Sequence, residues 1–202
     1  MLKSTLLIFI CFCCCFKLQL FSQQALSKYE RNWMLAHPFL SAKIYKHLKE
    51  TTVIYKEVKL NKVLADTIDS GGKLDAFRHT FTMAYLCRYV KVDKLRSLGQ
   101  LHEKGNKDNF LKNYTEYGER ADSLACEMDL RNNELGFTIG VNQKELTISK
   151  LKLYVLEQIM QGNAWYFKKN SNNSYLSCQN NPIDIDDYKN VWYIPKCLTQ
   201  TE

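Results

Sequence analysis

Apolar residues recur at helical spacing along most of this chain, and that periodicity is the strongest constraint on its fold. Residues 74–90 show it most clearly, because Phe77, Phe81 and Ala84 fall on one helical face. Similar faces predict helices near residues 25–50, 53–67, 74–90, 92–103, 115–131 and 147–161. We therefore expect a mainly α protein, a multi-helix orthogonal or antiparallel bundle followed by an irregular C-terminal tail.

Residues that disfavour helix mark the expected boundaries. Ser70-Gly71-Gly72 predicts one break, and the run 105–109, GNKDN, predicts an exposed loop. Asn132, Asn133 and Gly136 tolerate left-handed backbone and predict a helix end. Further on, residues 170–182 are rich in Asn and Ser, which is typical of loop. The predicted organisation is a helical domain over 25–165 and a tail over 166–202.

The first 22 residues have the features of a secretory signal peptide. Lys3 supplies a positive charge, and residues 6–16 form an uncharged run that is too short to cross a bilayer. Ser22 suits the position before a cut, although Leu20 fits the small-residue rule poorly. We expect an exported protein, periplasmic or secreted, without an integral membrane span in the mature chain. An uncut membrane anchor and a lipoprotein are the alternatives.

Export changes the interpretation of the cysteines. Four of the eight lie in the predicted leader, which leaves Cys87, Cys126, Cys178 and Cys197. Cys178 and Cys197 flank a loop-rich stretch, so we predict a disulfide between them, which would contribute roughly 3 kcal/mol in the chain-entropy model. Cys87 and Cys126 lie in helical patterns, where buried free thiols are favoured over a second disulfide.

The net charge says little about partners. It is +7 for the whole chain and falls when Lys3 and Lys17 leave with the leader. The remaining lysines are scattered, so a solvated surface is the favoured interpretation. Nucleic acid is disfavoured as a partner without being excluded, and we expect a small-molecule or cell-envelope substrate instead.

Three short polar motifs contain residue types that ligate metals or move protons at neutral pH. They are Asp75-Ala-Phe-Arg78-His79, then His102-Glu103, then the segment 128–136 with Asp129, Asn132 and Asn133. Helical spacing puts the polar residues of the first motif on one face within a turn. If neighbouring helices pack antiparallel, as short connections favour, the three motifs meet at one end of the bundle.

Spacing alone does not separate a functional site from a structural network. Arg78 with Asp75 is also an ordinary ion pair between neighbouring turns. His79 also suits a hydrogen-bonded contact between helices. The metalloprotease pattern His-Glu-x-x-His is absent, because Asn106 stands where the second histidine would be.

Taken in order, the three motifs resemble an uncharacterised bacterial family, a domain of unknown function found in exported proteins and at the ends of large secreted proteins. The resemblance covers roughly residues 30–165 and begins around Trp33 and His37-Pro38. This chain departs from the family at Thr82, where the pattern usually has an aromatic residue three positions after the histidine. The departure concerns the shape of a pocket, not the polar set. The resemblance implies a recurring polar site without implying a reaction.

These observations leave three hypotheses for function. In the first, an exported metal-assisted hydrolase with a divalent metal ion cleaves an anionic phosphodiester, lipid or cell-wall substrate. Its catalytic residues would be His79, His102, Glu103 and Asp129, its metal ligands Asp75, His79, His102 and Glu103, and its substrate-binding residues Arg78, Asn132 and Asn133. In the second, the polar set is a buried structural network that fixes helix register. In the third, a non-catalytic module binds an anionic ligand through Arg78.

Overall fold

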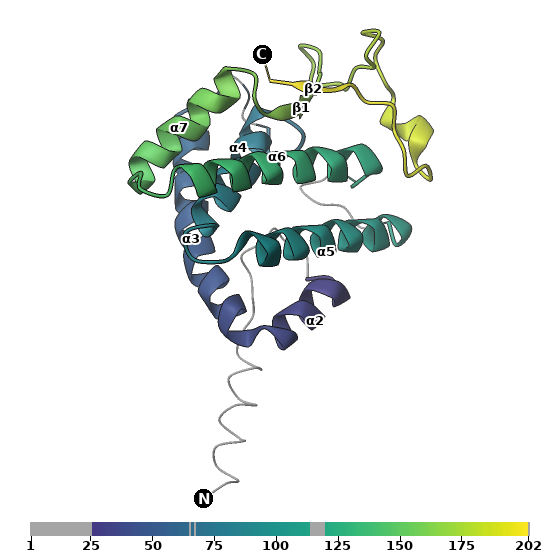
Figure 1. Cartoon of the computed structure of the whole chain (residues 1–202). Helices are drawn as coiled ribbons and strands as arrows, with labels where there is room; N and C mark the ends of the chain where they lie inside the picture. The colour runs from purple at the N-terminus through teal and green to yellow at the C-terminus, as the bar shows by residue number, and fades with distance from the viewer. Residues whose placement is uncertain (1–25, 65, 67, 114–119, 202) are drawn as a thin grey trace, which may run out of the picture.

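The structure is a computed structural model that describes residues 26–64, 66, 68–113 and 120–201. The predicted leader and part of the predicted helix 115–131 lie outside these residues. The described part contains six α-helices and one two-stranded sheet. The prediction of a mainly α fold with a C-terminal region of low helix content is confirmed (Figure 1).

The first described helix, α2, spans Lys28–Ala36 and begins with a reciprocal cap. The backbone N–H of Glu30 donates to the Ser27 hydroxyl, and the backbone N–H of Ser27 donates to the Glu30 carboxylate. This capping box satisfies two N–H groups that the first turn of a helix would otherwise leave unpaired. It also holds the Glu30 carboxylate in a fixed, largely buried position.

The second helix, α3, spans Pro38–Leu60, so the predicted range 25–50 is divided at His37. Proline suits its first turn, where no helical partner for an N–H exists. The predicted interruption near residues 50–53 is wrong. The hydroxyls of Thr51 and Thr52 both donate to the carbonyl of Leu48 and so bond within the helix. Both hydroxyls are therefore satisfied inside the helix, which continues through both threonines.

The next two helices are α4, Lys73–Leu86, and α5, Val92–Leu111. The predicted loop at 105–109 is wrong, because these residues continue α5. Gly105 serves close packing there: a Cβ on it would lie only 2.5 Å from the Cβ of Ser27. The glycine lets α2 approach α5. It is therefore a point of contact between two helices, and α5 is not interrupted there.

Helix α6 spans Ser123–Asn142 and passes through Asn132, Asn133 and Gly136. The prediction that these residues end a helix is therefore wrong. Both asparagine side chains are buried and make contacts outside the helix, with a backbone strand and with a histidine ring. Their polar groups are satisfied without unwinding the backbone.

Helices α4 and α6 run parallel at very short range. A Cβ on Gly136 would lie 2.5 Å from the carbonyl oxygen of Thr80, and one on Gly140 would lie 2.6 Å from that of Ala84. Positions four residues apart on α6 thus meet positions four residues apart on α4, in the same order. Figure 1 shows α5 beside α6 and α3 crossing their ends.

We expect Gly140→Ala to destabilise the protein by about 1–2 kcal/mol. Replacing glycine by alanine inside a helix normally gains up to about 1 kcal/mol. Here the added methyl group meets the α4 backbone, and overpacking of this kind costs typically about 1–3 kcal/mol. Urea unfolding measures the change. Thr138→Ala, on the exposed side of α6, is the matched control and should change stability by less than about 0.5 kcal/mol.

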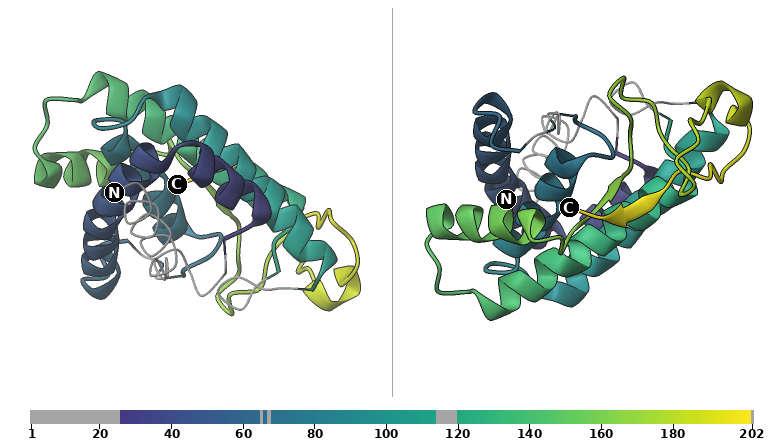
Figure 2. Two further views of the ribbon diagram at one scale, coloured as in Figure 1. Left: turned by 90° about the horizontal axis from the view of Figure 1, so that it is seen from below. Right: turned by 90° about the horizontal axis from the view of Figure 1, so that it is seen from above.

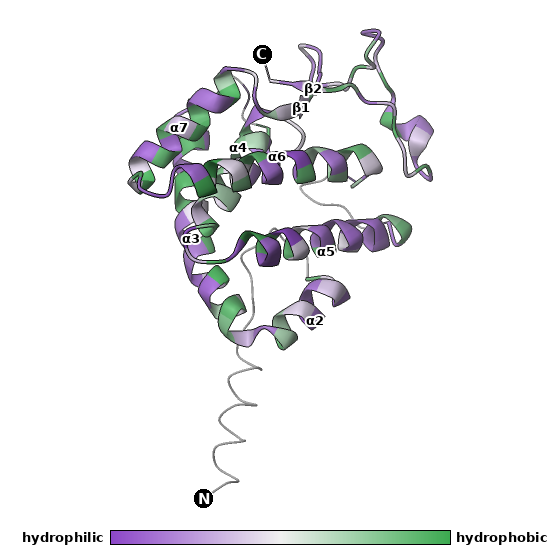
Figure 3. Ribbon diagram, in the orientation of Figure 1, coloured by the Kyte–Doolittle hydropathy of each residue, from purple (hydrophilic) through white to green (hydrophobic). Residues whose placement is uncertain are grey.

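The last helix, α7, spans Ile148–Met160 and closes the main core. Phe77 and Phe81 of α4 are almost fully buried there, against Leu151 and Val155 of α7. A second apolar cluster joins α2, α3, α4 and α5 around Trp33. Hydrophobic and hydrophilic residues alternate around each helix (Figure 3), as the predicted periodicity requires.

The C-terminal region packs back onto the helices. Strand β1, Trp165–Phe167, pairs antiparallel with β2, Leu198–Gln200, and a short 3-10 helix, η1, covers Ile185–Tyr188. Cys178 and Cys197 form a disulfide, whereas Cys87 and Cys126 are free thiols, which confirms the predicted pairing. Among the residues that the structure describes, none of the helices is both long and apolar enough to span a membrane.

A buried ion pair fastens this region to α6. Asp122 caps α6 by accepting two backbone hydrogen bonds, and its Oδ2 lies 2.5 Å from Nζ of Lys196. The two side chains are 1% and 3% exposed. The rings of Phe167 and Tyr175 lie 4.1 and 4.5 Å from the same Nζ. Figure 2 shows the C-terminal segment lying against the start of α6.

Candidate functional site

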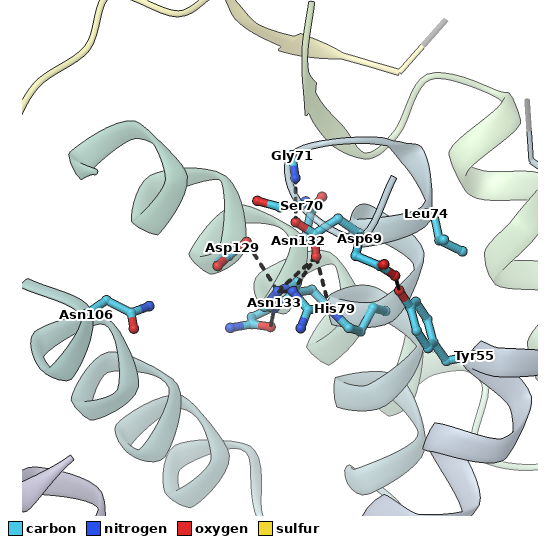
Figure 4. A network of polar contacts seen from close by, with 12 residues as sticks. Tyr55, Asp69, Ser70, Gly71, Leu74, His79, Asn106, Asp129, Asn132 and Asn133 are labelled. Atoms are coloured by element: carbon cyan, nitrogen blue, oxygen red, sulfur yellow. Dashed lines mark hydrogen bonds and ion pairs between the residues drawn. The ribbon is translucent and has the colours of Figure 1, made fainter. Parts of the chain in front are cut away.

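The parallel packing of α4 and α6 brings three potential metal ligands together. Asp75 and His79 lie one turn apart on α4, and Asp129 faces them from α6. One ligand atom of each residue lies within 4.8 Å of the other two. Nε2 of His79 lies 3.2 Å from Oδ1 of Asp129 (Figure 4), and it lies 3.5 Å from Oδ1 of Asp75. We call these three residues the triad.

Asp75 is held by the turn that precedes α4. The backbone N–H of Gly71 donates to its Oδ2 at 2.7 Å, and Nε of Arg78 donates to its Oδ1 at 3.0 Å. Gly71 has a φ of 75°, and a Cβ there would lie 2.9 Å from the ring of Phe167. The glycine-rich break seen in the sequence therefore positions a ligand of the site.

His79 presents a lone pair to the carboxylates. Its Nδ1 lies 3.3 Å from Oδ1 of Asn133, an oxygen that can only accept, so Nδ1 carries the proton. Nε2 is then unprotonated: it accepts a hydrogen bond from Nη2 of Arg78 at 3.1 Å and also faces both aspartates. Burial and the neighbouring Arg78 lower the pKa of His79 to about 4, so the ring is neutral at neutral pH. A neutral imidazole with its far nitrogen bonded to an amide is the form that ligates metals.

Asp129 requires a proton or a cation. Its Oδ1 is buried and accepts no hydrogen bond from any residue in the described part of the chain. Burial raises the pKa of Asp129 well above its usual range, and the nearby carboxylates of Asp75 and Glu103 raise it further. A negative Asp129 facing the lone pair of His79 would be unfavourable, because both atoms are acceptors. A metal ion bound between them would satisfy both.

The metal-free protein should lose stability through His79 as the pH falls from about 6.5 to about 4. In that window the unfolded chain binds a proton at His79 that the folded chain does not. The contribution of His79 to the free energy of unfolding is therefore complete above pH 6.5 and is lost progressively as the pH falls to about 4. The shift corresponds to roughly 3 kcal/mol. Unfolding in urea at pH 7 and pH 4.5 measures it. Equal losses for the natural protein and His79→Gln would contradict this assignment.

A second polar group lies across a cavity from His79. Nδ1 of His102 on α5 lies 3.0 Å from Oε1 of Glu30, which the capping box of α2 holds in place. Beside it, Nδ2 of Asn106 donates to Oε2 of Glu103 at 2.9 Å. His102, Glu103 and Glu30 line the same cavity as His79. The second motif, His102-Glu103, therefore meets the first motif at this cavity without being part of the triad.

The structure groups the sequence-predicted residues differently from the motif analysis. Asp75, Arg78, His79, Asp129 and Asn133 make direct contacts with one another. His102 and Glu103, proposed as metal ligands from the sequence, stand outside the triad, whereas Asp129, proposed as a catalytic residue, completes it.

Asn132 points away from the triad. Its Nδ2 donates to the carbonyl of Trp165 at 2.9 Å, and its Oδ1 accepts from the Trp165 backbone N–H at the same distance. The side chain is fully buried. Both ends of its amide are therefore used to attach β1 to α6, which leaves substrate binding to other groups.

Two contributors were missed by sequence reasoning. Glu30 belongs to a Ser-x-x-Glu capping box, a pattern that is visible in the sequence but that predicts only a helix start. Asp66 accepts hydrogen bonds from the backbone N–H groups of Lys73 and Leu74, and so caps α4 from a distance. No sequence signal links Asp66 to a helix that begins seven residues later.

Fold and site together define a helical domain with a largely buried carboxylate–histidine cluster. The chain belongs to the family described as domain of unknown function DUF6973, whose model matches residues 31–163. All three triad residues lie within that span. The resemblance to an uncharacterised domain family is confirmed. No curated protein and no solved structure matches this chain.

Proposed function

We propose that the triad binds one divalent metal ion and that the protein is an exported, metal-assisted hydrolase of an anionic substrate. The observation that carries the proposal is the buried Oδ1 of Asp129, which faces an unprotonated histidine nitrogen at 3.2 Å. One histidine and two carboxylates suit Zn²⁺ or Mn²⁺ and leave coordination positions open. The disulfide supports export, because such bonds persist in oxidising compartments.

The remaining groups supply the other parts of a hydrolytic site. A divalent ion would polarise the scissile phosphate and lower the pKa of water. In hydrolysis the water oxygen bonds to phosphorus, the ester P–O bond breaks, and the leaving oxygen takes a proton. Glu103, which is 7% exposed and lines the cavity, would accept the proton of water, and His102, on the same cavity, would donate to the leaving group. Arg78 orients the anion at the triad.

The metal is tested by titrating chelator-treated protein with Mn²⁺ or Zn²⁺ in a calorimeter. We expect one ion per chain, with an affinity that rises with pH because the ion displaces the proton of Asp129. Asp129→Asn should weaken binding by more than the roughly 10–100-fold that outer-shell losses cost. Glu134→Gln is the matched control, since that carboxylate lies on the exposed side of α6 and pairs with Arg96.

The reaction is tested with bis(p-nitrophenyl) phosphate, a simple phosphodiester, in the presence of the same ion. Hydrolysis should depend on the metal and disappear in Asp129→Asn but persist in Glu134→Gln. Metal binding that Asp129→Asn leaves unaltered would overturn the proposal.

A structural network is the competing function, and the pairing of Arg78 with Asp75 favours it. A network whose purpose is helix register binds no ion and loses stability when Asp129 is changed. A metal centre behaves in the opposite way: without the ion, Asp129→Asn removes a buried ionisable group and should leave stability unchanged or higher. Unfolding of the metal-free variant therefore separates the two functions.

A further inference from the structure

A cavity of about 110 Å³ adjoins the triad and extends away from it between α2, α3, α4 and α5. One end is polar and is formed by Glu30, Arg78, His79, His102, Glu103 and Asn133. The rest is walled by apolar side chains of the second core cluster. They are Trp33, Ile44, Leu48, Leu86, Leu95 and Leu98.

The apolar part of this cavity has the character of a ligand site. Protein interiors are normally close-packed, and a void lined by apolar side chains costs stability because its walls lack contacts. Ser41 also lines the space, but its hydroxyl already donates to the carbonyl of His37 at 2.9 Å. Water gains few hydrogen bonds in such surroundings, and apolar cavities of this kind stay dry.

We infer that the substrate of this site is an amphiphile, an anion whose adjoining apolar group enters the cavity. The inference rests on the proposed function, since the anion would bind at the triad. An apolar cavity of about 150 Å³ accepts benzene. The space seen here therefore suits a short alkyl group of about four carbons or a small branched one, held next to the bond that reacts.

The test is a series of alkyl phosphates, from methyl to butyl, titrated into Mn²⁺-loaded protein, with inorganic phosphate as the reference. Each methylene that enters the cavity should increase the affinity about fourfold. The increase should stop when the cavity is full. Equal affinities for methyl and butyl phosphate would overturn the inference.

Two variants fill the cavity from different helices, Thr82→Phe on α4 and Leu98→Phe on α5. Each should abolish the dependence on chain length while inorganic phosphate still binds. Leu153→Phe, at an exposed position of α7, is the control and should leave the series unchanged. A dependence of affinity on alkyl length that persists in both filled variants would overturn the inference. If neither variant folds, the alkyl phosphate series on the unmodified protein is the test.

A neutral probe separates this inference from the metal proposal. Xenon should raise the melting temperature of the metal-free protein but not that of the filled variants. If no metal binds and xenon does, the proposed function fails while the apolar site stands. If metal binds and neither xenon nor longer alkyl chains do, the amphiphile is overturned and the metal centre stands.

Discussion

Replacing Lys196 by methionine should lower the free energy of unfolding by about 3–5 kcal/mol, the usual cost of breaking a buried ion pair from one side. Methionine keeps an apolar stem against Phe167 and Tyr175. It leaves the carboxylate of Asp122 buried without its cation. Denaturant unfolding with a fitted slope gives the loss, provided that the transition stays two-state.

The double variant Lys196→Met/Asp122→Ser is the control for this prediction. Serine caps a helix about as well as aspartate does and carries no charge. The double variant should therefore recover most of the stability that the single change removes. A single Lys196→Met variant within about 1 kcal/mol of the natural protein would show that the pair is not buried in solution.

Asn132→Ala should be the second large loss of stability, about 2–5 kcal/mol, without an effect on metal affinity. The change leaves the N–H and the carbonyl of Trp165 without their partners, and an unsatisfied buried group costs roughly 1–3 kcal/mol. It also removes a fully buried side chain. Unfolding in urea and metal titration of the same preparation measure the two effects.

The neighbouring Asn133→Ala should instead lower the metal affinity and have a smaller effect on stability. Asn133 bonds Nδ1 of His79 and so fixes which nitrogen carries the proton. Losing such an outer partner typically weakens metal binding by 10–100-fold. The stability change should be smaller than for Asn132, because the ring keeps its other contacts. If Asn132→Ala weakened the metal and Asn133→Ala did not, the roles assigned to the two residues would be wrong.

The sequence predicted the helices whose ends carry ordinary signals. Apolar and polar residues of 74–90 fall on two different faces of a helix, and the structure has α4 at Lys73–Leu86. Helix α7, which Thr147 caps, occupies Ile148–Met160 within the predicted range 147–161. Asp75 and His79 on one face follow from helical spacing alone. These features are local, so nearby residues determine them.

The rest depends on contacts between distant segments. Gly105, Gly136 and Gly140 disfavour helix locally, yet here each permits a neighbouring helix to approach. Sequence rules include the low helix propensity of glycine, but they do not include the close approach of a neighbouring helix. In the same way, the choice of Asp129 over His102 as partner of His79 follows from α6 running parallel to α4, and no local pattern encodes that direction.

The buried ion pair between Lys196 and Asp122 has a consequence for the order in which the protein folds during synthesis. Asp122 begins the helix that carries Asp129, but its cation lies far along the chain and leaves the ribosome long after that helix. Until then the start of α6 contains an uncompensated charge where it must pack. Thr201, directly after β2, donates to the carbonyls of Ala164 and Ile159 and is also synthesised late. A chain built in this way completes the packing around α6 only after residues 196–201 have been synthesised, when Cys197 also becomes available to pair with Cys178.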